Sequence, residues 1–165
     1  MSKAEQIPAV APRVAHAIFT LERTFAASPR RVFAAWSTPA GKAAWFGGPA
    51  DQWTPTERQF DFRVGGVETA VGKWNSGVVS SFRAVYQDIL SDQRIVYAYS
   101  MKLDDRPISA SLATVEFRAH GEGTQLIVTE QGAFLDGYAD DGSREQGTAF
   151  LLDRLQAALA EGVLN

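Results

Sequence analysis

Residues 143–162 read SREQGTAFLLDRLQAALAEG and form the longest segment with helical periodicity in this chain of 165 residues. At 100° per residue, one apolar stripe, expected to face a sheet, contains Leu151, Leu155, Ala158 and Leu159. Gly147 falls on the same side of this helix. Phe150 projects outside the stripe, so we expect it at a rim or on a contact surface. Ser143 and Gln146 match a capping box at the start of the helix, and Gly162 is placed to end it.

The region before this helix has the period of strands rather than helices. Six runs alternate in polarity and are separated by short breaks rich in turn residues: TERQFDFRV (56–64), GVETAVGKW (66–74), GVVSSFRAVYQDIL (77–90), RIVYAYSMKL (94–103), ISASLATVEFRAH (108–120) and TQLIVTEQGAF (124–134). Six consecutive strands with short connections predict an antiparallel meander.

Gly65 and Gly66 stand between the first two of these runs. Paired glycines can cradle a phosphate, but that chemistry needs a helix N-terminus behind them to supply amide groups and a dipole. A strand follows instead, so we interpret the pair as a hairpin turn.

The first part of the chain adds one more strand and two short helices. One strand with a single solvent-exposed face is predicted by the alternating polarity of AIFTLERTF (17–25). Ser28 and Thr38 each precede a proline, which is the pattern of an N-cap followed by Pro at the first helical position. Residues 1–16 have no periodicity and are expected to form a flexible arm, leaving 17–165 as a single domain.

Composition limits the classes of function. The net charge is −3, without the basic patch of a nucleic-acid-binding protein. There is no cysteine, and no apolar run approaches the length of a membrane span, so we expect a cytoplasmic protein. His16 and His120 fall at the junction of the arm with the domain and in a hairpin, where neither is placed as a base or a metal ligand. We predict no catalytic residue, metal or cofactor.

These elements predict an α+β fold in which a curved antiparallel sheet of about seven strands surrounds a long C-terminal helix. This order resembles the Bet v 1-like, START-related (SRPBCC) helix-grip fold. Four segments resemble the branch named for homology to the activator of the Hsp90 ATPase: VFAAWSTPAGKAAWFGGP (32–49), FDFRVGG (60–66), GTQLIVTEQG (123–132) and GTAFLLDRLQAAL (147–159). Relatives often carry Trp at the position of Phe150.

The resemblance implies a cavity between the sheet and the long helix, and strand phase supplies its candidate walls. We expect the cavity to be lined by Trp45, Phe46, Phe82, Tyr86, Tyr97, Tyr99, Met101, Phe117, Glu130, Leu151 and Leu155. The alternative is that the aromatic residues are ordinary core. Trp45 and Phe46, beside Gly47 and Gly48, are also candidates for a lid that swings on glycine hinges.

Glu130 is the one ionisable residue whose strand phase points inward, together with Leu126 and Val128. An inward carboxylate needs a partner or a raised pKa, and Arg23 on the first strand has the matching phase. The alternative is that the strand ends before Glu130 and leaves it at a solvated rim.

Three classes of function fit these expectations. The first, which we rank highest, is a module that binds a small apolar or amphipathic molecule. The others are a partner-binding accessory protein of the chaperone-activator kind, and a helix-grip enzyme such as a cyclase, lyase or hydrolase. A charged side chain inside the cavity would favour the enzyme, and an exposed aromatic patch around Phe150 or Trp53 would favour the accessory protein. A homodimer is an open alternative.

Overall fold

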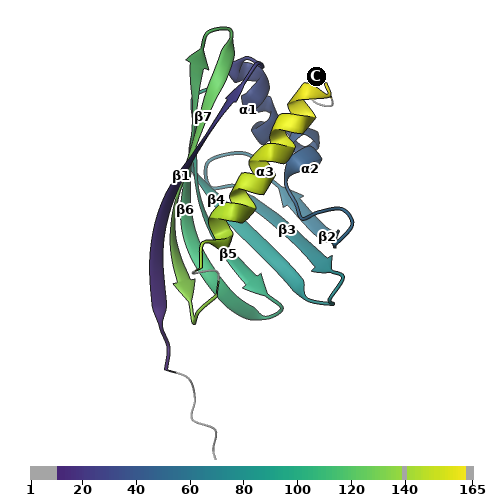
Figure 1. Cartoon of the computed structure of the whole chain (residues 1–165), viewed down its shortest axis with the longest axis vertical. Coiled ribbons are helices and arrows are strands. Elements are labelled where there is room, and N and C mark those ends of the chain that lie inside the picture. The colour runs from purple at the N-terminus through teal and green to yellow at the C-terminus, as the bar shows by residue number, and fades with distance from the viewer. Residues whose placement is uncertain (1–10, 139–140, 163–165) are drawn as a thin grey trace, which may run out of the picture.

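The computed structural model describes residues 11–138 and 141–162. One antiparallel sheet, with the strand order β1-β7-β6-β5-β4-β3-β2, curves around a single long helix (Figure 1). The elements are β1 (Val14–Phe25), α1 (Pro29–Ser37), α2 (Pro39–Trp45), β2 (Trp53–Phe60), β3 (Val67–Trp74), β4 (Val79–Leu90), β5 (Arg94–Leu103), β6 (Arg106–His120), β7 (Gly123–Leu135) and α3 (Ser143–Ala160). The predicted α+β helix-grip fold is confirmed.

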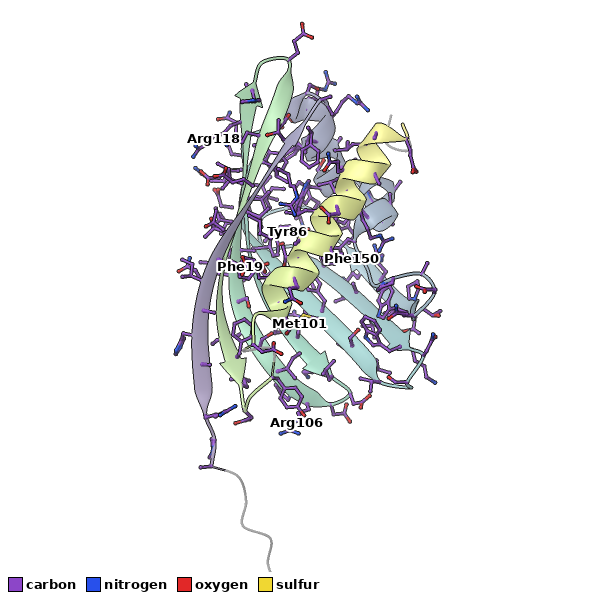
Figure 2. The ribbon with its side chains drawn as sticks, viewed as in Figure 1. Phe19, Tyr86, Met101, Arg106, Arg118 and Phe150 are labelled. Atoms are coloured by element: carbon purple, nitrogen blue, oxygen red, sulfur yellow. The ribbon has the colours of Figure 1, made fainter. Side chains whose placement is uncertain are left out.

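The meander from β2 to β7 pairs each strand with its neighbour in the sequence. The exception is β1, which pairs with β7 and places the first strand beside the last. Alternation gives the sheet two faces. Ile95, Tyr97 and Tyr99 of β5 are buried on the concave side, whereas Arg118 of β6 points away from the side that α3 covers (Figure 2). β1 begins at Val14, three residues earlier than expected, and residues 1–10 of the predicted arm lie outside the described residues.

The two short helices form where the sequence predicts them. The Ser28 hydroxyl accepts a hydrogen bond from the Arg31 amide (3.3 Å), and the Thr38 hydroxyl accepts one from the Gly41 amide (3.1 Å). A proline follows each cap. These helices cover one end of the concave face, where Phe33 and Trp36 of α1 pack edge-on against Phe117 of β6.

The connection between β2 and β3 is a turn, as predicted, but a longer one. β2 ends at Phe60 rather than at Val64. Gly65 has a φ of +80°, and its amide donates to the carbonyl of Tyr86 (2.8 Å). A Cβ atom on Gly66 would lie 2.1 Å from the Asp61 carbonyl oxygen, so only glycine fits there. The paired glycines therefore serve the backbone conformation of the turn.

The terminal helix lies across the concave face, but its start and its buried stripe differ from the prediction. Its N-cap is Gly142, with no side-chain cap, so the capping box does not form. The Ser143 amide instead donates to Asp141 (3.1 Å). The residues buried against the sheet are Leu152, Leu155, Ala158 and Leu159. Leu151, expected in this stripe, is only partly buried. Within residues 11–138 and 141–162, none of the helices combines the length and the apolar character needed to cross a membrane.

Candidate functional site

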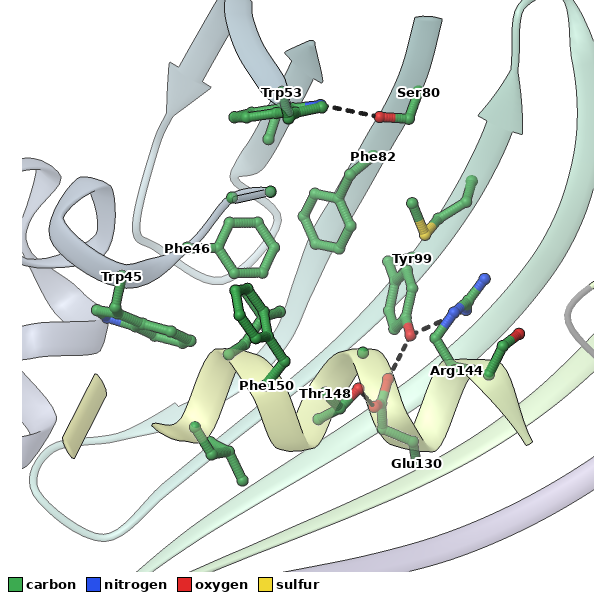
Figure 3. A pocket seen from close by; sticks show the side chains of 18 of the residues that line it. Trp45, Phe46, Trp53, Ser80, Phe82, Tyr99, Glu130, Arg144, Thr148 and Phe150 are labelled. Carbon is green, nitrogen blue, oxygen red and sulfur yellow. Dashed lines mark hydrogen bonds between the residues drawn. The ribbon is translucent and has the colours of Figure 1, made fainter. Parts of the chain in front are cut away.

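A cavity of about 350 Å³ lies between the concave face of the sheet, α3 and the loop that follows α2 (Figure 3). Nine of the 24 residues that line it are aromatic. Of the residues predicted to line it, eight do so: Trp45, Phe46, Phe82, Tyr97, Tyr99, Met101, Glu130 and Leu151. Gly147 also lines it from α3, and Phe150, 41% exposed, lies at its rim.

Three predicted wall residues do not line this cavity, namely Tyr86, Phe117 and Leu155. Strand and helix phase place them on the correct face, but the cavity occupies only one end of the space beneath α3. At the other end, α1 and α2 fill that space. Phe117 packs there against Phe33 of α1. Leu155, which belongs to α3, is completely buried. Tyr86 donates instead to Glu68 (3.1 Å) in a separate buried cluster.

Glu130 supplies a carboxylate to the cavity wall. It lies inside β7, opposite Ala113 of β6 and Phe19 of β1, and is 4% exposed. The Tyr99 hydroxyl donates a hydrogen bond to Oε1. The Thr148 hydroxyl donates one to Oε2 (2.5 Å). The strand therefore continues past Glu130, which points inward rather than lying at a solvated rim.

Arg144 extends this hydrogen-bond network on the other side of Tyr99. Its guanidinium donates to the Tyr99 hydroxyl oxygen (3.1 Å) and to the Ser109 hydroxyl (2.8 Å). Arg144 and Thr148 are four residues apart on α3 and so share one helical face. The four side chains Arg144, Tyr99, Glu130 and Thr148, which we call the polar network, form a continuous chain of hydrogen bonds at the cavity (Figure 3).

The environment of Tyr99 fixes its protonation state. Burial raises the pKa of Tyr99 well above its ordinary value, the charge of Glu130 raises it further, and Arg144 opposes the shift. The hydroxyl is therefore neutral at physiological pH and can donate to Glu130 while it accepts from Arg144. This gives the hydrogen bonds of the polar network a defined direction.

The predicted pairing of Glu130 with Arg23 is wrong. Arg23 lies opposite Leu126 on β7, and the β1 residue opposite Glu130 is Phe19. Four residues along a strand correspond to about 13 Å, which explains the separation. Arg23 instead lies 3.5 Å from Asp153 and donates to the Glu22 carbonyl. Phase places both side chains on the same face, but only the register shows that they are far apart.

Hydrogen bonds to its carbonyl groups hold the loop at residues 46–48, which we predicted as a lid. Trp45 is 1% exposed and its indole N–H donates to the Ala35 carbonyl (2.9 Å). Arg58 donates to the Phe46 carbonyl (2.5 Å). Arg154 donates to the carbonyls of Gly47 (2.9 Å) and Gly48 (3.1 Å). Two arginines thus hold three consecutive carbonyls, and a lid formed by Trp45 and Phe46 would have to break these hydrogen bonds to open.

Two tryptophans, Trp53 of β2 and Trp74 of β3, line the cavity near the β2 edge of the sheet. The indole N–H groups of Trp53 and Trp74 both donate to the Ser80 hydroxyl, each at 3.1 Å. The ring of Trp53 lies against the backbone of Gly72, where a Cβ atom would come within 1.9 Å of it. Trp53 is buried, so it offers no exposed aromatic patch.

Sequence reasoning missed Arg144, Thr148 and Ser80 as wall residues. Arg144 and Thr148 could have been found from the helical periodicity. They lie one turn apart on α3, on the inner side of the helix where Gly147 was predicted. Among the described residues, no group of three or more His, Asp or Glu side chains could hold a metal ion. His16 and His120 are both exposed.

Comparison with known proteins identifies the family. The family model described as "Activator of Hsp90 ATPase homolog 1-like protein" matches residues 26–160. A putative uncharacterized protein from Rhizobium leguminosarum is 43% identical, with a TM-score of 0.88 over 92% of this chain and 99% of its own. The Mll3558 protein from Rhizobium loti is 44% identical, with a TM-score of 0.80 over 88% of this chain and 98% of its own.

A more distant structure shows how far the fold extends. The AHSA1-like protein from Aeromonas hydrophila is 20% identical and has a TM-score of 0.66 over 90% of this chain and 96% of its own, which shows a common fold. No curated protein matches the sequence. The family match covers α1 to the end of α3, including the strands and helix that build the cavity. The chain therefore belongs to the family of Activator of Hsp90 ATPase homolog 1-like proteins.

Proposed function

We propose that the protein binds a small, largely apolar molecule that carries a hydroxyl group, with the hydroxyl at the polar network and the apolar body against the aromatic wall. The observation that carries this proposal is a buried carboxylate, Glu130, bonded to neutral hydroxyl groups in a cavity that is largely apolar. Membership of the family supports a ligand-binding or accessory role in general terms.

The size and lining of the cavity support a drug-sized ligand. A volume of about 350 Å³ falls at the lower end of the range of about 300–1,000 Å³ found for small-molecule sites. Phe46 and Phe82 pack with their ring centroids 4.9 Å apart, and Phe82 lies 5.0 Å from Tyr99. These rings offer a continuous apolar surface that a flat or branched hydrocarbon body can cover.

The polar network favours a neutral ligand group. The Glu130 carboxylate and the Arg144 guanidinium both bond to the Tyr99 hydroxyl, so their charges offset within the network. A charged ligand group would add an uncompensated charge in a poorly hydrated space. Free lone pairs remain on Glu130 and on the Thr148 hydroxyl, and these accept rather than donate. A ligand hydroxyl, which can donate to them, therefore fits better than a carbonyl.

Matched pairs of ligands test this proposal. A thermal-shift screen would compare flavonoids, sterols and polyketides with analogues that lack the hydroxyl, and with fatty acids. Because binding to the native state raises stability by mass action, a ligand at a hundredfold excess over its dissociation constant adds about 2.7 kcal/mol. We expect the hydroxylated members to raise the melting temperature most.

Two variants connect the screen to the site. Glu130→Gln should weaken hydroxylated ligands while leaving the fold intact, and Glu122→Gln, at the exposed turn between β6 and β7, is the matched control. A flat screen over all classes, or equal loss of binding in both variants, would contradict the proposal.

An enzyme is the second candidate, and Glu130 is the observation that favours it. A carboxylate inside a cavity, beside a neutral tyrosine and near an arginine, has the parts needed to take a proton from a bound molecule. Incubation of each binder with the protein, followed by mass spectrometry, would reveal turnover. If the protein is an enzyme, the native protein should convert the ligand to a product of different mass, and the Glu130→Gln variant should leave the ligand unchanged.

The accessory-protein alternative depended on an exposed aromatic patch around Phe150 or Trp53. Trp53 is buried, and Phe150 lies at the cavity rim with its ring 5.9 Å from the Arg154 guanidinium. A single exposed ring is too small for a specific protein interface, which buries roughly 800 Å² on each partner. We therefore favour a small-molecule ligand.

A further inference from the structure

A second cavity, of about 380 Å³, lies between α2 and the strands β2 and β3. Phe46 and Ala70 line both cavities, so Phe46 forms part of the wall between them. The charged side chains that line the second cavity are Lys42, Arg58 and Glu68. None of them belongs to the polar network around Glu130, so this site is separate from the one proposed above.

The inner end of the second cavity is a buried ion pair. The Lys42 ammonium lies 2.8 and 3.0 Å from the two oxygens of Glu68, and both side chains are almost completely buried. Tyr86 adds a hydrogen bond to Glu68. Burial lowers the pKa of Lys42, whereas the charge of Glu68 raises it in opposition. The pair is electrically neutral as a unit, and each of its charged groups has hydrogen-bond partners.

Arg58 adds a positive charge that this pair does not balance. Its guanidinium bonds to the Phe46 carbonyl, and it has no ion-pair partner among residues 11–138 and 141–162. Arg58 is exposed on the outer side of the cavity; desolvation lowers its pKa, Glu68 raises it, and the nearby charge of Arg154 lowers it again. Two cations therefore line the cavity with one carboxylate, which leaves a net charge of +1.

We propose that the second cavity binds a small organic carboxylate. The carboxylate would bond to Arg58, whose planar guanidinium matches its two oxygens, and would balance the excess charge. Phe46, Phe60 and Pro39 would contact the apolar body of the ligand. A dianion such as phosphate fits less well, because its second charge would not be balanced and would be repelled by Glu68.

Titration with benzoate, followed by two-dimensional NMR, tests this proposal. We expect benzoate to shift the amide signals of residues 42–46 and 58–60, and to do so less strongly as salt is added. Arg58→Gln should weaken benzoate at least about tenfold, because it removes a charge-assisted hydrogen bond. Arg63→Gln, which alters an exposed arginine paired with Asp61, is the matched control and should bind as the native protein does.

Two further ligands separate the contribution of the carboxylate from that of the ring. Benzyl alcohol, which keeps the ring but lacks the charge, should not shift the signals of Arg58 and Phe60, which line only the second cavity. Inorganic phosphate should bind more weakly than benzoate. Glu130→Gln should bind benzoate normally, so failure of the first site would leave this result intact. Absence of benzoate shifts near Arg58, equal affinity in Arg58→Gln, or tighter binding of phosphate would each overturn the proposal.

Discussion

Glu130 is the residue on which the candidate site depends. It is a carboxylate buried without an ion-pair partner among the described residues, and two neutral hydroxyl groups satisfy it, from Tyr99 on β5 and Thr148 on α3. A carboxylate in such a place costs desolvation energy that a purely structural core would avoid. The alternation of β7 predicted its inward direction, but its partners come from distant parts of the chain and could not be read from phase alone.

Substitution of Glu130 should separate hydrogen bonding from charge. Glu130→Gln keeps an acceptor and a donor of similar shape, so the free energy of unfolding should change by less than about 1 kcal/mol. Glu130→Leu leaves the hydroxyls of Tyr99 and Thr148 without an acceptor and should cost about 1–3 kcal/mol. Urea unfolding measures both values. Equal stability of the leucine variant and the native protein would mean that these hydrogen bonds contribute little.

The buried tyrosines predict a loss of stability at alkaline pH. Burial raises the pKa of Tyr86, Tyr97 and Tyr99, and the charges of Glu68 and Glu130 add to this effect. Above the unfolded pKa of about 10, the unfolded chain releases these protons while the native protein keeps them, so stability falls as pH rises. Each tyrosine then contributes a slope of about 1.4 kcal/mol per pH unit.

Ultraviolet absorbance of tyrosinate checks this expectation. Three of the four tyrosines should stay protonated in the folded protein at about pH 11 and ionise only as it unfolds. A smooth titration of all four in the native state, with no accompanying loss of secondary structure, would show that the cavity is open to solvent.

At the level of elements, α3 shows what a sequence pattern can and cannot predict. Its length, its end near Gly162 and the inward side of Leu155 and Leu159 follow from periodicity. The buried stripe is nevertheless rotated relative to the prediction, because Leu152 is buried and Leu151 is not. α2 and β1 contact α3, whereas the first half of the helix lines the cavity, so the most buried side chains depend on where the cavity lies.

The two neighbouring leucines of α3 therefore make a matched test. Leu152→Ala removes a fully buried side chain and should cost about 2–5 kcal/mol, whereas Leu151→Ala changes a partly exposed wall residue and should cost clearly less. Both leucines line the first cavity, so either substitution should also enlarge it and alter ligand preference. Thermal or urea unfolding of both variants gives the comparison. A larger loss of stability in Leu151→Ala than in Leu152→Ala would favour the buried stripe predicted from the sequence.

Local signals predicted the other elements with similar success. Ser28-Pro29 and Thr38-Pro39 identified both short helices, because capping is a short-range interaction. The predicted end of β2 lies four residues too late, since the alternation in FDFR continues into a loop that Gly66 allows. Strand pairing was correct in order, but the β1–β7 register, which separates Arg23 from Glu130, required the three-dimensional structure.

At the scale of the whole molecule, a sheet that curves around one helix leaves space that its side chains do not fill. α1 and α2 fill one end of that space, and the two cavities occupy the region around Phe46. The arginines Arg58 and Arg154 fix the loop between them through its carbonyl groups. The fold thus combines a well-packed core at one end with a cavity that carries a polar network at the other.

A crystal structure of the protein with the best hydroxylated binder from the screen tests the central claim most directly. We predict ligand density in the first cavity, with the hydroxyl oxygen within hydrogen-bond distance of Glu130 or Thr148 and the body against Phe46 and Phe82. Density elsewhere on the molecule, or a ligand whose hydroxyl points to solvent and whose apolar part contacts Glu130, would contradict the account.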